Sequence, residues 1–168
     1  METTKTWKKV SDKKYIFWVG EKKIGELELL HSKWIRNVIL NIEGELLSIE
    51  RTSFWKNNWQ VLDYKGNVIL KAYNEKWFSK QTTLEYQNNK LQIITRNNPL
   101  AEFVIAKDGE ELLSYGLKTD DRKVVTQITT AEGNKDYLLD FILWFLFRPI
   151  AHENSGDNLV FHTLLMST

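Results

Sequence analysis

The sequence contains no cysteine among its 168 residues. A disulfide framework, a thiol nucleophile and a thiolate metal site are therefore excluded. Proline is scarce, with two residues, and no Ser-, Gly- or Pro-rich linker divides the chain, so we expect one domain over residues 1–168. An excess of charge is also missing. The 23 Lys and Arg residues face 22 Asp and Glu residues, which argues against nucleic acid as a partner.

Motifs for catalysis and for cofactor binding are missing as well. No Gly-rich phosphate loop follows a strand and opens a helix, and no Gly-x-Ser-x-Gly elbow is present. The histidines His31, His152 and His162 do not have the spacing of two ligands on one helical turn, so we expect no metal site. Asp120 and Asp121 are adjacent and would point to opposite faces of a strand, so we interpret them as a turn. The sequence favours a non-enzymatic role without a cofactor; an enzyme would need His152 or His162 beside a carboxylate in a pocket.

Short β-prone runs separated by Gly, Asn or Asp fill most of the chain. They form five successive pairs, 15–19 with 24–30, 38–42 with 46–49, 59–63 with 68–73, 84–86 with 91–95, and 102–106 with 111–115. The turn residues tolerate the positive φ angles of tight hairpins, and several runs alternate apolar with polar side chains. The pattern predicts a mostly β fold, a meandering antiparallel sheet of roughly ten or more strands that can curl or close on itself.

One apolar run, residues 136–148, has a different pattern. Asn134 or Asp136 can cap a helix there, Arg148 suits its C-terminal dipole, and Pro149 predicts its end. Apolar side chains cover every side of this helix, and Asp140 is its only internal polar residue. A helix that is apolar all round must be buried all round.

Three environments could bury this helix. A membrane span needs roughly 20 apolar residues, and residues 137–147 would cover only about 16 Å of a ~30 Å hydrocarbon core. A helix lying on a membrane surface needs a polar face, which is absent here. We therefore expect the helix to be enclosed by the curved sheet, and the chain not to be transmembrane. The polar loop 152–158 and residues 159–165 that follow predict either a final strand or a loosely ordered end.

Basic residues gather at the start of the chain. Residues 1–36 contain nine Lys and Arg against five Asp and Glu, a net charge of +4. Lysines that protect exposed sheet edges are the interpretation we favour; a contact with anionic lipid is the alternative. The candidate contacts are Lys8, Lys9, Lys13, Lys14, Lys22, Lys23, Lys33 and Arg36. Residues 1–5 lack the apolar core of a signal peptide, which favours a cytoplasmic location.

The hairpins followed by a hydrophobic helix resemble the tubby C-terminal-like superfamily, which includes the LURP-one-related proteins and the phospholipid scramblases. The resemblance rests on Trp59–Ala72, on Lys76–Ser79 and on Ala131–Asp136, and covers roughly residues 38–149. It implies a closed barrel of about twelve strands threaded by the helix. It also implies a non-catalytic binding or scaffold role, near membranes or phosphoinositides in some members. In that family the helix usually ends the domain, whereas about twenty residues follow it here.

A lipocalin-like carrier of a small apolar ligand is the main alternative function. Such carriers have a tryptophan near the start of the chain, antiparallel strands and a late helix, and this sequence has Trp7 and the same order of elements. Their helix, however, packs outside the barrel and keeps a polar face. The position of the 136–148 helix therefore distinguishes the two functions. The sequence does not define the oligomeric state, and the partner is expected to be anionic lipid or another protein.

Overall fold

The computed structural model describes residues 4–31, 36–53, 57–76, 80–97, 100–155 and 161–166, with the backbone alone at 31, 36, 155 and 161–166. These residues form thirteen strands and one helix, α1 (Tyr137–Ser155). The strands are β1 (Lys5–Ser11), β2 (Lys14–Val19), β3 (Lys22–His31), β4 (Arg36–Ile42), β5 (Glu45–Arg51), β6 (Trp59–Asp63), β7 (Val68–Tyr73), β8 (Gln81–Tyr86), β9 (Asn89–Asn97), β10 (Ala101–Lys107), β11 (Glu110–Asp120), β12 (Lys123–Ala131) and β13 (Phe161–Met166).

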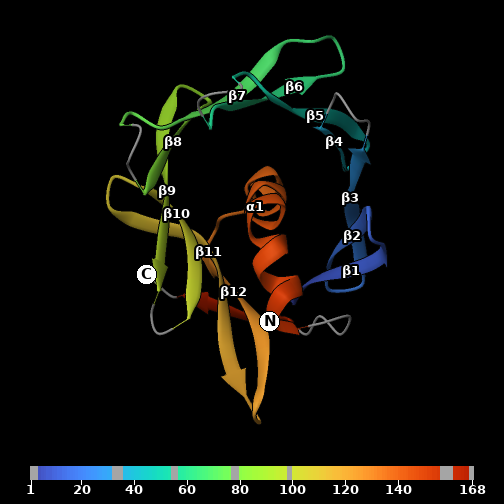
Figure 1. Cartoon of the computed structure of the whole chain (residues 1–168), viewed down its shortest axis with the longest axis vertical. Helices are drawn as coiled ribbons and strands as arrows, with labels where there is room; N and C mark the ends of the chain where they lie inside the picture. Colours follow the sequence, from blue (N-terminus) through green and yellow to red (C-terminus); the bar gives the residue numbers. More distant parts are fainter. Residues whose placement is uncertain are drawn as a thin grey trace.

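All thirteen strands belong to one sheet and follow one another in sequence order. Strands β1 to β12 pair antiparallel with their neighbours, and β13 pairs parallel with β12. Because β13 also contacts β1, the sheet curls into a nearly closed barrel with α1 inside it (Figure 1). The predicted architecture, a mostly antiparallel barrel that encloses one helix, is confirmed.

The predicted hairpins form because their turn residues adopt left-handed backbone conformations. The turn between β6 and β7 has φ +84° at Gly66, and the turn between β10 and β11 has φ +51° at Asp108 and +84° at Gly109. Gly and Asp enter this region more easily than β-branched residues do. Asp121 and Arg122, also with positive φ, form the predicted charged turn between β11 and β12.

The helix begins at a side-chain cap. Asp136 accepts a hydrogen bond from the backbone N–H of Leu138 through its carboxylate, at 3.2 Å. Asn134 caps Asp136 in the same way, also at 3.2 Å. These bonds satisfy N–H groups that the first helical turn leaves without partners.

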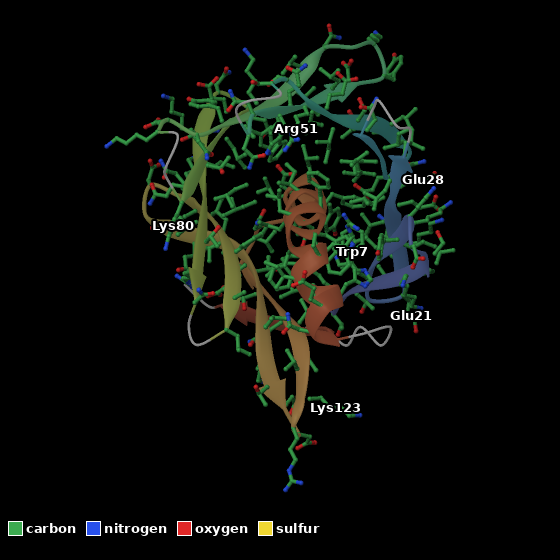
Figure 2. The ribbon with its side chains drawn as sticks, viewed as in Figure 1. Trp7, Glu21, Glu28, Arg51, Lys80 and Lys123 are labelled. Carbon is green, nitrogen blue, oxygen red and sulfur yellow. The ribbon has the colours of Figure 1, made fainter. Side chains whose placement is uncertain are left out.

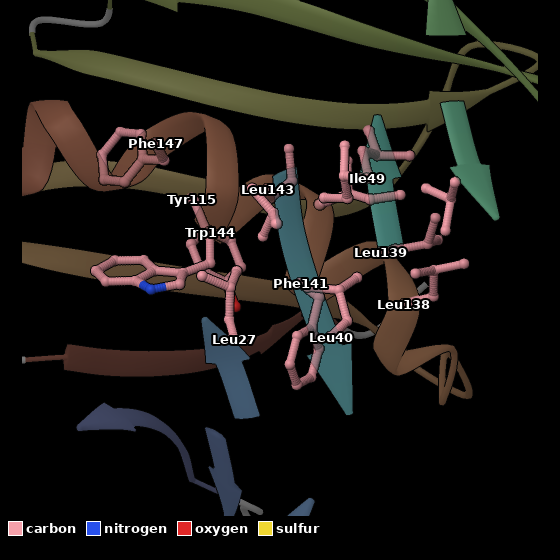
Figure 3. Packing of buried hydrophobic residues seen from close by; sticks show 14 of the residues in the cluster. Leu27, Leu40, Ile49, Tyr115, Leu138, Leu139, Phe141, Leu143, Trp144 and Phe147 are labelled. Carbon is pink, nitrogen blue, oxygen red and sulfur yellow. The ribbon is translucent and has the colours of Figure 1, made fainter. Parts of the chain in front are cut away.

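The core is built from the apolar residues of α1 and the inward-facing side chains of the strands. Phe141, Trp144 and Phe147 are fully buried and lie among strand residues such as Leu27 and Leu40 (Figure 3). Trp7 of β1 stacks on Trp144 with ring centroids 5.4 Å apart. Such aromatic pairs contribute roughly 0.5–1.5 kcal/mol beyond the area they bury.

The predicted end of the helix at Pro149 is wrong. The helix continues through Pro149 to Ser155, so it ends seven residues later than the predicted 136–148. Proline leaves the carbonyl of Phe145 without its usual helical donor. Pro149 is exposed, whereas Ala151 is fully buried in the core. Packing of the residues after the proline therefore maintains the helix. Water near exposed Pro149 reduces the cost of the hydrogen bond that the Phe145 carbonyl lacks.

The segment after the helix contains a strand, which was one of the two predicted outcomes. Strand β13 lies along β12 with Thr126 opposite Phe161 and Ala131 opposite Met166. The chain thus runs through the barrel as a helix and returns along its wall.

Candidate functional site

A polar cluster lies inside the barrel at the first turns of α1. Lys5 Nζ donates hydrogen bonds to both carboxylate oxygens of Asp140, at 2.8 and 3.0 Å. The Tyr115 hydroxyl donates to Asp140 Oδ1 at 2.9 Å, and Trp7 Nε1 donates to the Tyr115 oxygen at 2.9 Å. All four side chains are buried, with exposed fractions of 6% for Lys5 and 1% for Asp140.

Strand alternation brings these residues together. Lys5 and Trp7 are two apart on β1 and both point inward, and Tyr115 points inward from β11. Figure 2 shows Trp7 directed toward the helix, while Glu28 and Lys123 point away from the barrel. Asp140 comes from the start of α1, so three distant segments supply the cluster.

The electrostatics of the cluster are those of a closed site. Burial raises the pKa of Asp140, and the neighbouring Lys5 and Tyr115 oppose this rise. Burial and the nearby Asp140 carboxylate raise the pKa of Tyr115. A buried ion pair of this kind needs several hydrogen bonds to offset its desolvation, and Asp140 receives three.

The cluster therefore has a structural role rather than a catalytic one. Its titratable groups already use one another as partners, and Asp140 at 1% exposure offers no surface to a substrate. Trp7 directly precedes the candidate surface lysines Lys8 and Lys9 in the sequence, but its side chain faces the core. A lone Asp140 in an apolar helix was the available signal: a buried carboxylate requires a buried donor or cation.

His152 lies near the end of α1, not in a free loop as its sequence context suggested. Its Nε2 is 2.5 Å from the hydroxyl of buried Tyr15, with the rings in an edge-on contact. The pKa of Asp12 is lowered mainly by Lys9 and, to a smaller extent, by His152. The contact joins the last helical turns to β2. The side chains of His31 and His162 lie outside the described residues.

The structure places six of the eight predicted anionic-surface contacts on β1, β2 and β3 or in the turn after β1, and it pairs four of the six with carboxylates. Lys14 and Lys23 both bind Glu26, at 2.9 and 2.5 Å. Lys22 binds Glu43 at 2.8 Å.

Lys9, Lys8 and Lys13 have different surroundings. Lys9 binds Asp12 at 2.9 Å. Lys8 Nζ lies 4.9 Å from the ring centroid of Trp18, and Lys13 is exposed in the turn after β1. Within the described ranges, no carboxylate lies within ion-pair distance of Lys8 or Lys13.

Two of the predicted contacts, Lys33 and the side chain of Arg36, lie outside the described residues. The six lysines that can be placed carry less free charge than their number suggests, because four of them are paired. Lys8 and Lys13 are therefore the strongest candidates for contact with an anionic surface.

A groove of about 350 Å³ opens at the rim of the barrel between β7 and the β8–β9 hairpin. It is lined by residues 68–71 on one side and 85–90 on the other. Burial and the nearby Asp136 raise the pKa of Tyr86, one of the residues that line the groove. The sequence does not predict this groove, because the groove depends on where two neighbouring strands separate.

The part of the chain that the structure describes contains no group of three His, Asp or Glu side chains arranged to hold a metal ion. Over the same residues, no helix combines the length and the apolar character that crossing a membrane demands. The chain matches no protein-family model, no curated protein and no solved structure.

Proposed function

We propose that this chain is a non-catalytic binding or scaffold domain whose contacts lie on the outer wall and the rim of the barrel. The observation that carries the proposal is the position of α1. Phe141, Trp144 and Phe147 are fully buried against the strands, in the place that a lipocalin-like carrier keeps for its ligand. The interior cluster at Asp140 is likewise closed to a substrate.

The arrangement of the strands supports a resemblance to the tubby C-terminal-like superfamily. Twelve antiparallel strands in sequence order surround one hydrophobic helix, as the resemblance implies. The departure lies after the helix, where β13 adds a parallel strand to β12. The proposed role near membranes follows from this resemblance and from the chemistry of the β1–β3 surface.

An anionic lipid surface is the partner that we propose for β1–β3. Lys8 lies over Trp18, Lys13 is exposed, and Val10 is 57% exposed between them in sequence. An aromatic ring, an exposed apolar side chain and two cations that have no carboxylate partner among the described residues suit the boundary between lipid headgroups and acyl chains.

Vesicle co-sedimentation tests this partner. We expect more protein to pellet with vesicles that contain phosphoinositide than with neutral phosphatidylcholine vesicles, and less at high salt. At ~1 kcal/mol for each lysine, Lys8→Gln/Lys13→Gln should weaken binding about thirtyfold. The matched control, Lys118→Gln/Lys123→Gln, removes two exposed lysines from the β11–β12 hairpin and should bind normally. Equal pelleting with both kinds of vesicle would refute the lipid contact.

A further inference from the structure

Strand β7 has a short free edge at the rim of the barrel. Its register with β6 runs from Val61 opposite Leu70 to Leu62 opposite Val68, so Ile69 is an extra residue that forms a β-bulge. The register with β8 ends where Leu70 faces Tyr86, and Val68 and Ile69 have no partner residue on β8. The groove of about 350 Å³ runs along this free edge.

The β8–β9 hairpin forms the opposite wall of the groove. Gln87 and Asn88 have φ of +50° and +59°, and the chain reverses there in a two-residue turn. The hairpin therefore ends two residues short of the start of β7. The groove is the notch that this difference in length leaves, and Figure 1 shows β7 and β8 as neighbours at this part of the wall.

Exposed apolar side chains lie on β5, in the β6–β7 turn and at the start of β7, where Val68 also lines the groove. Leu46, Tyr64 and Val68 are 49%, 72% and 43% exposed, and they are three of the five large hydrophobic side chains that are exposed in the described ranges. Val68 pairs directly with Leu62 on the outer face. Tyr64 directly follows Asp63, which pairs with Leu47 of β5. An exposed apolar patch beside an unpaired strand edge is typical of a protein-interaction surface.

The side chains that line the groove carry a net positive charge. Its lining includes Lys71 and Lys90 against one carboxylate, Glu85. Glu85 already accepts a hydrogen bond from the Tyr73 hydroxyl at 2.8 Å. In the described part of the chain, neither lysine has a carboxylate within ion-pair distance. The groove is therefore complementary to an acidic ligand.

We propose that the notch binds an extended segment of a partner protein that alternates apolar residues and carries acidic residues at its ends. Its backbone would pair with the free edge at Val68 and Ile69, and its apolar side chains would meet the Val68 patch. The carboxylate at the end beside the β8–β9 turn would meet Lys71 and Lys90, which flank Glu85 in one row across the strands. Addition of a strand to an open edge is a common mode of peptide recognition. This site lies on other strands than the proposed lipid contact, so either can fail without the other.

Amide-shift titration by NMR tests the proposal. The probe is the acetylated, amidated peptide Asp-Val-Thr-Val-Asp, added to the full ¹⁵N-labelled chain without vesicles. We expect saturable shifts at the amides of Val68 and Ile69 and in the β8–β9 turn. The β10–β11 turn at Asp108 and Gly109 serves as the internal control and should not shift. Lys-Val-Thr-Val-Lys should bind at least about fivefold more weakly, as should the acidic peptide with N-methylated valines.

A charge-reversal variant makes the test independent of changes in stability. In Lys71→Glu/Lys90→Glu both substitutions are at exposed positions, and the preference should reverse in favour of the lysine-flanked peptide. Absence of saturable shifts at Val68 and Ile69 with the acidic peptide would overturn the proposal. Equal binding of the N-methylated peptide, or an unchanged charge preference in the variant, would overturn it as well.

Discussion

The buried ion pair between Lys5 and Asp140 can be tested quantitatively by removing each partner alone and both together. Lys5→Met removes the ammonium group and keeps an unbranched apolar chain. Asp140→Asn removes the negative charge and keeps the shape of the side chain. Each single change leaves the other charge in the core, where Asp140 is 1% exposed. The double variant leaves neither charge.

The structure sets the expected magnitudes. Breaking a buried pair by removing one partner costs about 3–5 kcal/mol, so with Lys5→Met near 3 kcal/mol the two single changes should sum to about 6–8 kcal/mol. Lys5→Met should lie at the lower end because the Asp140 carboxyl keeps its bond from Tyr115 and, with its raised pKa, can take up a proton. The double variant should cost only about 2–3 kcal/mol, mainly for imperfect hydrogen bonding of the new amide. The coupling energy is therefore about 4 kcal/mol.

Urea unfolding at neutral pH measures these energies. Circular dichroism follows the sheet, and tryptophan fluorescence follows all seven tryptophans, which include the core residues Trp7 and Trp144 with centroids 5.4 Å apart. Agreement between the two signals shows that unfolding is two-state, and a common slope allows midpoints to be compared. The same cycle at Lys14 and Glu26 is the surface control. Their ion pair at 2.9 Å is partly exposed, so its coupling should be far smaller.

A coupled buried pair is contradicted if the double variant loses the sum of the two single losses to within about 0.5 kcal/mol. Such additivity would mean that Lys5 and Asp140 contribute to stability independently. A surface coupling as large as the buried one would refute it too, because burial would then not be the cause.

Three further results are expected. Gly25→Ala should cost at least about 2 kcal/mol in urea unfolding, because the added Cβ would lie 1.9 Å from the Asn41 carbonyl oxygen. The control Gly116→Ala should cost no more than about 1 kcal/mol, because its Cβ meets the Glu102 side chain at 3.0 Å, and that side chain can move. Equal losses in the two variants would contradict this. Hydrogen bonds from Lys23 and Lys14 lower the pKa of Glu26 below 4.5, so Glu26 stabilises the folded state above pH 4.5 and loses this effect as the pH falls through its folded-state pKa. Glu26→Gln should reduce the loss of stability at acidic pH, measured as urea midpoints across that range. A pH profile unchanged by the substitution would contradict this. Pro149→Ala should raise the stability by about 1–3 kcal/mol by restoring a helical hydrogen bond, measured as a higher melting temperature, and a lower one would show that the proline is required.

Local patterns were sufficient to predict the five hairpins that run from β2 to β11, whereas β1 and β12 were not among the predicted runs. The hairpin between β6 and β7, for example, follows from two β-prone runs around a turn in which Gly66 has a positive φ. The enclosed helix followed from composition, since a run that is apolar on every side has no other stable environment here. The end of the helix did not follow, because the effect of Pro149 depends on the burial of Ala151 two residues later.

The candidate sites could be predicted less well, because they depend on contacts between distant segments. The number of lysines in the sequence indicates a basic surface on β1–β3. The sequence does not indicate that Glu26 binds both Lys14 and Lys23. The notch at Val68 depends on a bulge and on the position of the next hairpin. Neither has a local sequence signature that distinguishes it from an ordinary turn.

The position of the Lys5–Asp140 pair explains why a barrel of this kind contains a buried ion pair. In the described part of the sheet, β1 and β13 are the first and last strands, and no hydrogen-bonded register joins them. Strand β1 therefore has a backbone partner on one side only, β2. Lys5 binds α1 and Trp7 binds Tyr115 of β11, so both side chains hold β1 against the interior at the seam. Apolar contacts alone would tolerate a shift of β1 by two residues, since its inward face would stay inward. A buried ammonium that must meet one carboxylate does not tolerate that shift, and the pair thereby fixes the register of the strand at which the barrel closes.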